Sequence, residues 1–486
     1  MTNTAAWVEA EMATVDLGHK ARNKRLKSVI GDLAAMPAAS IPAAVGGGRA
    51  ETEAAYRLFE NEAVEFDAIL APHSKSTLER VRQQRTVVLA QDSSEIDLTR
   101  PDQQVSGAGP LDDGARRGCF LHPLLALTAE GIPLGSLWVE CWTRDEPSDE
   151  VLDRTAKDKR RKQTPIEEKE SQRWVTGLKQ AHRAAAEAPD TEVIMVADSE
   201  ADIFELLVEG QSLEGRAQWI LRACQDRALR REKEAENDAA KSILQAVTAT
   251  ASKTTYEVNV RGRKPKVNCE TRGRRQARES RTATVEVRAC TVTLRAPYRH
   301  DRKLPDVTVN VVWVHELNPP VGEEPIEWLL LTSLPITTTK QVLRIIKSYC
   351  LRWMIELFFR VLKQGCRVEE RRFETINRVE RFLAVALIVA WRTLYVTRLG
   401  RDFPDLSCEA VFEPSEWKAV YQVTQKQSPP KTPPKLQEMV RMVAQLGGYV
   451  NRTRADEPGA ETIWKGLQRM HDMAQCWDLF GPGRRE

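Results

Sequence analysis

The sequence of 486 residues lacks the paired cysteines and histidines that mark most structural metal sites. Its nine cysteines are scattered singly without a C-x-x-C pair, and its seven histidines show no H-E-x-x-H spacing. These absences argue against a disulfide framework and against a structural zinc site. Unpaired cysteines are instead typical of reduced thiols in a cytoplasmic protein.

An amino-terminal signal and a membrane-spanning run are also missing. The first residues, MTNTAAWVEAEMATVDLG, show no basic segment followed by an apolar one, so we expect no secretion signal. The longest apolar run, FLAVALIVAWRTLYV, starts at Phe382 and is interrupted by Arg392. It is shorter than the roughly 20 residues that span a bilayer. We therefore expect a buried core helix and no membrane partner.

Positive charge is concentrated in two segments, although the net charge is only +3. DLGHKARNKRLKSVIGDLAAMP predicts a helix with Asp16 as its N-cap and a stop near Pro37. The run from Arg261 to Arg281 contains nine Lys or Arg residues and only two acidic ones. Both segments suit binding to DNA phosphates, and a solvated surface is the alternative for each. The candidate DNA-binding cations of the helix are Lys20, Arg22, Lys24 and Arg25.

The pattern of apolar residues predicts an α/β protein. Three strands, a helix, a strand, a helix and a strand are expected between residues 85 and 224. This order fits a mixed-sheet ribonuclease H-like fold, whose first and fourth strands lie side by side. A β-rich insertion interrupts it, and the two ends of the chain read as helical. We predict five segments: a helical DNA-binding domain at 1–80, the catalytic core at 81–225, the insertion at 226–337, the rest of the core at 338–400, and a helical domain at 401–486. The last segment contains two amphipathic helices, which either pack against their own chain or associate with a second copy.

The segment YCLRWMIELFFRVLK, residues 349 to 363, predicts a helix that is buried on most of its circumference. At about 100° per residue its polar side chains fall on one narrow stripe. A carboxylate flanked by cations and a phenol suits a site that holds metal ions beside phosphates, and a solvated face is the alternative. The stripe consists of Tyr349, Arg352, Glu356, Arg360 and Lys363.

Three acidic residues are candidate metal ligands. Asp92 and Asp198 each end a predicted strand, where open α/β sheets usually place their sites, and Glu356 lies on the polar stripe. Hard oxygen ligands without histidine indicate Mg²⁺, with Mn²⁺ as a substitute. Each acid could instead cap a helix or form a salt bridge. For Asp198 this alternative is serious, because VADSEAD also reads as a strand that runs into a helix N-cap.

Several blocks of the sequence resemble one family. The spacing of Tyr349, Arg352, Glu356 and Lys363 is the Y-(2)-R-(3)-E-(6)-K pattern of bacterial cut-and-paste DDE transposases of the IS-four family, which includes the transposase of transposon Tn-five. VADSEADIFELL resembles the family's block around its second aspartate. EAAYRLFEN, LNPPVGEEPIEWLLLTSLP and LGGYV also look like family blocks and stand in the same order. The sequence departs from the Tn-five transposase at the residue after Asp198, which is serine here and arginine there. This difference leaves the DNA-end preference open.

The resemblance implies roles for individual residues. Asp92, Asp198 and Glu356 would bind the metal ions. Tyr349, Arg352 and Lys363 would hold the DNA backbone near a base flipped out of the transposon end. Trp328 would stack on that base, although a tryptophan in a sheet core is the alternative. Three further candidates for this pocket are Arg222, Trp353 and Arg360.

The resemblance also implies a reaction and its partners. The expected enzyme nicks double-stranded DNA at transposon ends, forms and opens a hairpin, and joins the end to target DNA. It would work as a homodimer on the two ends, in a bacterial cytoplasm and on the nucleoid. Two other functions stay open: an inactive DNA-binding regulator derived from a transposase, and a metal-dependent nuclease of the same fold.

Overall fold

The computed structural model describes residues 5–146, 160, 163–211, 217–230, 240–260, 262, 279–450 and 457–482. The chain forms two compact units. Unit 1 comprises Met1–Glu150, Glu187–Thr191 and Trp353–Glu486, and unit 2 comprises Val151–Ala186 and Glu192–Arg352. Apart from Gly262, Glu279, Ser280 and Arg281, the predicted basic run lies outside the described residues.

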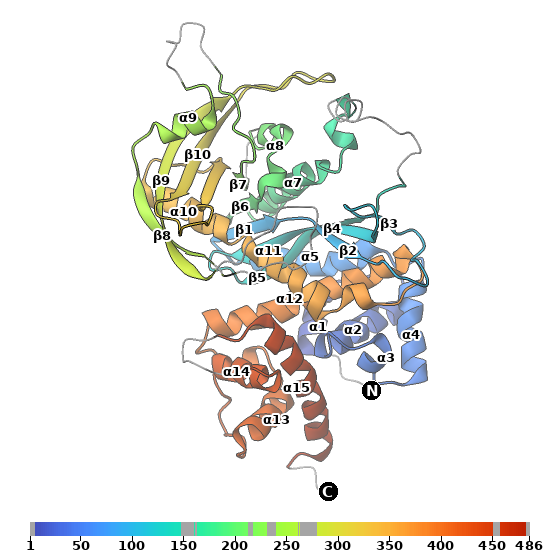
Figure 1. The fold of residues 1–486 in the computed structure, drawn as a ribbon. Coiled ribbons are helices and arrows are strands. Elements are labelled where there is room, and N and C mark those ends of the chain that lie inside the picture. Colours follow the sequence, from blue (N-terminus) through green and yellow to red (C-terminus); the bar gives the residue numbers. More distant parts are fainter. Residues whose placement is uncertain are drawn as a thin grey trace. The chain divides into compact units, whose positions relative to one another are not determined.

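Unit 1 begins with helices, as the sequence predicts (Figure 1). The expected N-cap of the basic helix is wrong: His19 caps it, and its Nδ1 accepts the Ala21 N–H at 3.2 Å. Asp16 instead accepts the Gly18 N–H, because a tight turn with Gly18 at φ +72° precedes the helix. The helices are α1 (Ala6–Glu11), α2 (Lys20–Ala35), α3 (Ile41–Ala44), α4 (Arg49–Glu60) and α5 (Phe66–Arg82).

An antiparallel sheet follows in unit 1, and β4 lies in its middle. β4 pairs with β1, β2, β3 and β5, and the β4–β5 hairpin turns at Gly131, whose φ is +93°. The three strands expected at the start of the 85–224 region are thereby confirmed as β1, β4 and β5, with β2 and β3 as short additions. The strands are β1 (Thr86–Gln91), β2 (Ser94–Asp97), β3 (Gly109–Pro110), β4 (Arg117–Thr128) and β5 (Pro133–Trp142).

The predicted helix at 349–363 is not continuous. α10 (Thr339–Cys350) ends in unit 2, a turn follows at Leu351 and Arg352, and α11 (Trp353–Arg360) starts unit 1 again. α11 then runs into a π-helical turn, η3 (Val361–Gly365), and a 3₁₀ turn, η4 (Val368–Glu370). A constant 100° per residue therefore does not hold across this segment, since a π turn has more residues than an α turn.

The apolar run from Phe382 forms the core helix α12 (Ile376–Asp402). By length and composition alone it is the one described helix that would suffice to cross a membrane, but 78% of its most apolar window is buried within the protein. The interrupting Arg392 lies over the Trp7 ring at 5.0 Å and donates to the Val411 carbonyl at 3.0 Å. The expectation of a core helix is confirmed.

Helices at the carboxyl end of unit 1 pack on the second half of α12. Their shared core contains Trp417, Met439, Val443 and Ile463, so the amphipathic tail buries apolar surface against its own chain. The proline-rich segment 428–435 is tied to the chain before α13, because the Cys408 N–H donates to the Pro434 carbonyl at 3.0 Å. The elements are η5 (Cys408–Ala410), α13 (Pro414–Gln425), α14 (Leu436–Leu446) and α15 (Ala460–Phe480).

Unit 2 starts with the predicted helix–strand–helix–strand order. β6 and β7 are parallel, and α8 connects them, as expected of a crossover between parallel strands. The interior strands carry buried Val193–Ala197 and Trp219–Leu221. The elements are η1 (Ile166–Glu168), α7 (Gln172–Glu187), β6 (Glu192–Ala197), η2 (Ser199–Ala201), α8 (Phe204–Glu209) and β7 (Ala217–Arg222).

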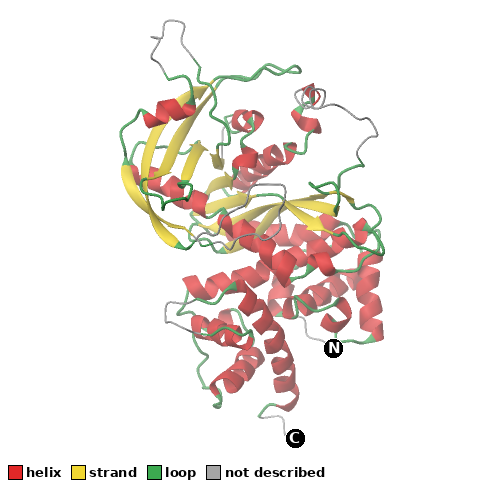
Figure 2. Cartoon of the chain, viewed as in Figure 1, coloured by secondary structure: helices red, strands yellow, loops and turns green. Residues whose placement is uncertain are grey.

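The β-rich insertion continues the sheet of unit 2, which Figure 2 shows as yellow strands. β11 pairs antiparallel with β7, and the order then runs through β10 and β9 to β8. α10 packs on β6 and β7. The mixed sheet with helical termini has the predicted ribonuclease H-like α/β character. The insertion contains α9 (Ile243–Thr248), β8 (Thr254–Val260), β9 (Arg281–Leu294), β10 (Val307–Glu316) and β11 (Glu327–Thr332).

Candidate active site

Asp92 follows β1 at the point where the chain turns into β2. The strand before it, TVVLAQ, is buried along five of its six residues, so its position is fixed by the core of unit 1. The backbone N–H of Ser93 donates to Asp92 Oδ1 at 2.8 Å. Asp92 is partly exposed, as a side chain that meets a ligand must be.

Glu356 lies in the first turn of α11. Its neighbours Met354, Ile355 and Phe358 are buried, whereas Glu356 is partly exposed. α11 packs against β1, so unit 1 brings the helix with Glu356 beside the strand that ends at Asp92. Two carboxylates carried by adjacent elements suit a hard divalent cation. In the part of the chain that the structure describes, no three Asp, Glu, His or Cys side chains form a group that could hold a metal.

The remaining stripe residues of unit 1 have ionic partners. Lys363 is on the π turn, and its Nζ lies 3.6 Å from Glu369 Oε1. Arg360 is exposed, with Nη2 3.7 Å from Glu461 Oε2. Trp353 is 42% exposed. Because η3 is a π turn, Lys363 does not follow Glu356 with regular α-helical spacing.

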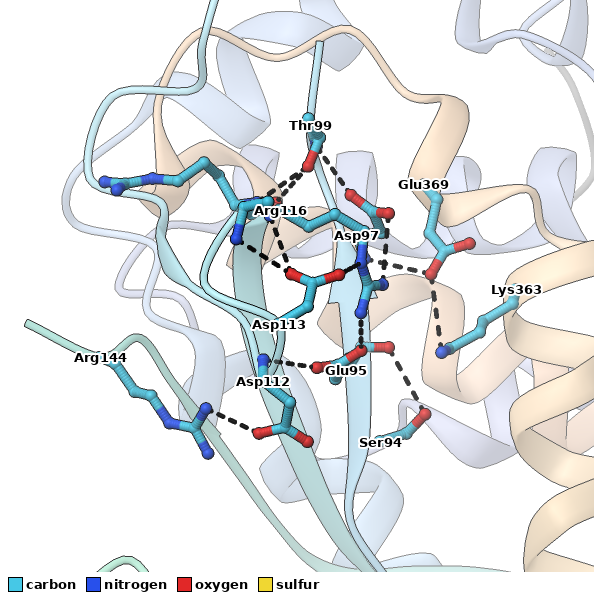
Figure 3. A network of polar contacts seen from close by, with 12 residues as sticks. Ser94, Glu95, Asp97, Thr99, Asp112, Asp113, Arg116, Arg144, Lys363 and Glu369 are labelled. Carbon is cyan, nitrogen blue, oxygen red and sulfur yellow. Dashed lines mark hydrogen bonds and ion pairs between the residues drawn. The ribbon is translucent and has the colours of Figure 1, made fainter. Parts of the chain in front are cut away.

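Glu369 links Lys363 to a larger polar network (Figure 3). Glu369 Oε1 also accepts the Asp97 N–H at 3.1 Å, which ties η4 to β2. At the centre of the network, Arg116 contacts three carboxylates, and its contacts with Asp113 and Glu95 raise its pKa further above the usual range. The three are Glu95 at 2.7 Å, Asp97 at 3.4 Å and Asp113 at 2.5 Å.

Asp198 belongs to unit 2 and follows β6. Its Oδ1 accepts the Glu200 N–H at 2.9 Å, so Asp198 caps the 3₁₀ turn η2. The alternative prediction that Asp198 acts as an N-cap is therefore confirmed. A carboxylate has two oxygens and about four acceptor positions, so the cap leaves room for a second role.

Tyr349 is the centre of a polar cluster in unit 2. It is 6% exposed, and its ring lies 5.7 Å from the Trp328 ring in an edge-to-face arrangement. Burial raises the pKa of Tyr349, the nearby guanidinium groups of Arg352 and Arg222 act to lower it, and Asp198 acts to raise it. Unit 2 thus brings together five predicted site residues: Asp198, Arg222, Trp328, Tyr349 and Arg352.

Trp328 is held at the edge of this cluster. It lies on β11 opposite Val314 and is partly exposed, so it is not a fully buried core tryptophan. Arg222 Nη2 donates to the carbonyl of the preceding residue, Glu327, at 3.2 Å. The Glu327 carboxylate accepts the Trp313 indole N–H at 2.9 Å. The Trp328 ring itself contacts Tyr349, and part of its surface stays accessible.

The amino-terminal cations lie on α2. Lys20 and Lys24 are exposed, and Arg22 and Arg25 are partly exposed. Arg22 Nη1 donates to the Leu17 carbonyl at 3.1 Å. From the predicted basic run, Arg281 pairs with Glu316 and lies 3.3 Å from Glu323, so it belongs to a local salt-bridge network.

Sequence reasoning missed two residues that contact a predicted site residue or its sequence neighbours. Glu369 stands 13 positions after Glu356 in a segment without a pattern, and only the fold brings it to β2. His122 sits in the apolar strand FLHPLLAL and contacts both neighbours of Asp92 in the sequence. A lone histidine in a buried strand must find hydrogen-bond partners, and that was the available signal.

Three family models match this chain, and together they cover most of it. They are "Transposase DNA-binding" at residues 4–64, "Transposase DDE domain" at 165–392 and "Transposase Tn5 dimerisation domain" at 388–476. Asp198 and Glu356 lie within the second match, and Asp92 lies before it. A solved structure, a piggyBac transposase synaptic complex with hairpin DNA, aligns over 99% of this chain and 79% of its own at 7% identity, with a TM-score of 0.36.

Proposed function

We propose that this chain, which belongs to the DDE transposases of the Tn5 type, carries out DNA transposition with Asp92, Asp198 and Glu356 as its metal ligands. The protein is a DNA transposase that cleaves DNA and transfers strands. The proposal concerns its residues, its metal and the order of its steps. The observation that supports it most strongly is the packing of α11 on β1, which carries Glu356 to the strand that ends at Asp92.

Asp92, Asp198 and Glu356 would hold the divalent cations. All are oxygen ligands, and Asp92 and Asp198 follow strands whose residues are buried, so the protein can hold them in fixed positions. This donor set fits Mg²⁺, with Mn²⁺ as a substitute. When bound, a pair of such cations activates the attacking oxygen and stabilises the leaving oxygen.

The cluster around Tyr349 would bind the transposon end. Arg352, Lys363 and Tyr349 offer donors to the phosphates of the DNA backbone. Trp328 would stack on a base extruded from the end, which recovers part of the cost of unstacking. Its partial exposure beside Tyr349 supports this role. Arg222 would contact the same nucleotide, and Trp353 and Arg360 would border the pocket.

Other parts of the chain would hold the rest of the DNA and the second protomer. The exposed cations of α2, Lys20 and Lys24 with Arg22 and Arg25, lie within the match for DNA binding and would grip the end repeat. The segment 401–486 would form the homodimer that holds the two transposon ends. The DNA-binding domain would be 1–80, the catalytic core would be 81–225 with 338–400, and the insertion would be 226–337. The place of action would be the nucleoid in the bacterial cytoplasm.

One site would run successive displacements at phosphorus. Water attacks at the transposon end, and the 3′ oxygen leaves as a free 3′-OH. That hydroxyl attacks a phosphodiester of the opposite strand, the 3′ oxygen of the flanking DNA leaves, and a hairpin forms. A second water then attacks the hairpin phosphodiester and restores the 3′-OH. The same hydroxyl then attacks target DNA. Asp92, Asp198 and Glu356 keep their places throughout, and only the nucleophile changes.

Cleavage of a labelled duplex tests the proposal. The duplex carries the inverted repeat that flanks the gene, and wild type is compared with Glu356→Gln in Mg²⁺. We expect a nick followed by a hairpin, with both products reduced at least about 1,000-fold in the variant, since a lost metal ligand removes several kcal/mol of transition-state stabilisation. Tight binding without cleavage in Mg²⁺ and Mn²⁺ would indicate a regulator, and nicks without strand joining would indicate a nuclease.

A further inference from the structure

His122 is a buried residue of β4 that contacts the chain on both sides of Asp92. Its side chain is fully buried. Its Nδ1 lies 2.7 Å from Ser93 Oγ, and its Nε2 lies 3.0 Å from Gln91 Oε1. Gln91 and Ser93 are the two sequence neighbours of Asp92. One imidazole thus bridges the end of β1 and the start of the connection to β2.

The hydrogen-bond pattern assigns a donor and an acceptor within the bridge. The Gln91 side-chain oxygen accepts only, so Nε2–H donates to it, and Nδ1 then accepts the Ser93 hydroxyl in a neutral ring. The ring edge also packs on Trp138, with centroids 5.8 Å apart. Both ring nitrogens and the ring itself are therefore engaged, and the imidazole has a single orientation.

This bridge holds the backbone on both sides of Asp92, whose carboxylate must point in a defined direction to bind a cation. Gln91 ends β1, and Ser93 stands between β1 and β2, so the chain leaves the regular strand at Asp92. Ser93 contributes twice, because its hydroxyl bonds His122 and its backbone N–H donates to Asp92 Oδ1 at 2.8 Å. A shift of Ser93 would move the donor that orients the carboxylate. Residues that orient a metal ligand typically contribute about 10- to 100-fold to metal affinity or activity.

We propose that His122 is a positioning residue for Asp92, which fixes the direction of that carboxylate toward a divalent cation through Gln91 and Ser93. The inference rests on the role of Asp92 as a metal ligand proposed above. His122 itself contacts neither DNA nor metal in this role. It acts through the two residues that it bridges.

Mn²⁺ binding measures this role without any cleavage step. The full chain, in complex with a duplex that carries the inverted repeat, is titrated with Mn²⁺, and free Mn²⁺ is followed by electron paramagnetic resonance. His122→Phe keeps an aromatic ring against Trp138 and removes both hydrogen bonds. We expect about 10-fold weaker Mn²⁺ binding. Affinity for the duplex in chelator is expected to stay within about twofold.

The chain offers a matched control in His73. It is also buried in unit 1 with two hydrogen bonds, because Nδ1 contacts Glu11 Oε1 at 2.6 Å and Nε2 accepts the Ser136 N–H at 3.0 Å. Neither partner is next to a candidate metal ligand. His73→Phe therefore disturbs a comparable buried network and should lower the melting temperature without changing Mn²⁺ affinity.

Asp92→Asn separates the failure of the inference from that of its premise. If this variant binds Mn²⁺ like wild type, Asp92 is not a metal ligand and the proposed site is wrong. If Asp92→Asn binds weakly but His122→Phe matches His73→Phe, the premise stands and the positioning role is overturned. Should His122→Phe not fold, Ser93→Ala decides, since it removes one of the two bonds from a partly exposed residue. We expect it to weaken Mn²⁺ binding about threefold, and wild-type binding would overturn the role.

Discussion

Lys363 and Glu369 show how a single contact can limit binding of a phosphate. Lys363 Nζ lies 3.6 Å from Glu369 Oε1, and both side chains are about 30% exposed. A DNA phosphate would compete with this carboxylate for the ammonium group. Glu369→Gln retains an acceptor for the Asp97 N–H and removes the charge. We expect about two- to fivefold tighter binding of end DNA at low salt, in line with a partly exposed ion pair, as measured by fluorescence anisotropy.

Glu370→Gln is the control for this prediction. Glu370 is the adjacent residue of η4 and pairs with Arg367 at 2.5 Å. Its removal changes the net charge by the same amount at nearly the same place. If both variants gain the same affinity for end DNA, the effect is one of general charge. If Glu369→Gln still raises DNA affinity in a variant that also carries Lys363→Gln, Lys363 is not involved.

At the scale of elements, the capping box of α13 contains a titrating group. Glu416 Oε2 accepts the Glu413 N–H at 2.8 Å, and burial raises the pKa of Glu416 from its usual 4.5 to about 7. The folded state then binds this proton more tightly than the unfolded chain. The stabilisation is complete below about pH 4.5 and is lost as pH rises through about 7.

We predict that unfolding of the carboxyl-terminal helices becomes easier by about 1–3 kcal/mol between pH 5 and pH 8, measured by scanning calorimetry. Glu416→Gln should remove most of this dependence, because the amide is neutral at both values. Glu438→Gln is the matched control, since Glu438 closes the capping box of α14 at the same position but is exposed. A pH dependence unchanged in Glu416→Gln would assign it to another group.

Elements with a clear apolar period could be predicted from the sequence, and their interruptions could not. TVVLAQ and EVIMVA are buried strands because β-branched and apolar residues run through them. The π turn at Val361–Gly365 has no such signal. Trp464 of α15 packs closely against Gly365, because a Cβ added at Gly365 would lie only 3.1 Å from the Trp464 ring. A contact with a helix about 100 residues away accompanies this local change, so no window of sequence contains it.

At the scale of the whole molecule, the proposed metal ligands are divided between the two units. Unit 1 carries Asp92 and Glu356, and unit 2 carries Asp198 with the cluster around Tyr349. Strand ends made the two aspartates predictable, because strand patterns locate them. The bridge that we propose to orient Asp92, through His122, depends on strand pairing and was not visible in the sequence. The proposed function therefore requires that Asp198 bind the same cations as Asp92 and Glu356.

Metal rescue of Asp198→Cys tests that requirement most directly. A thiolate is a poor ligand for Mg²⁺ and a better one for Mn²⁺. We predict that Asp198→Cys leaves a labelled transposon end uncut in Mg²⁺ and regains cleavage in Mn²⁺, whereas Glu200→Cys, on the exposed turn that Asp198 caps, cuts in both. Cleavage by Asp198→Cys in Mg²⁺ at the wild-type rate, or no cleavage in either metal by a folded, DNA-binding variant, would contradict the assignment of Asp198 as a metal ligand.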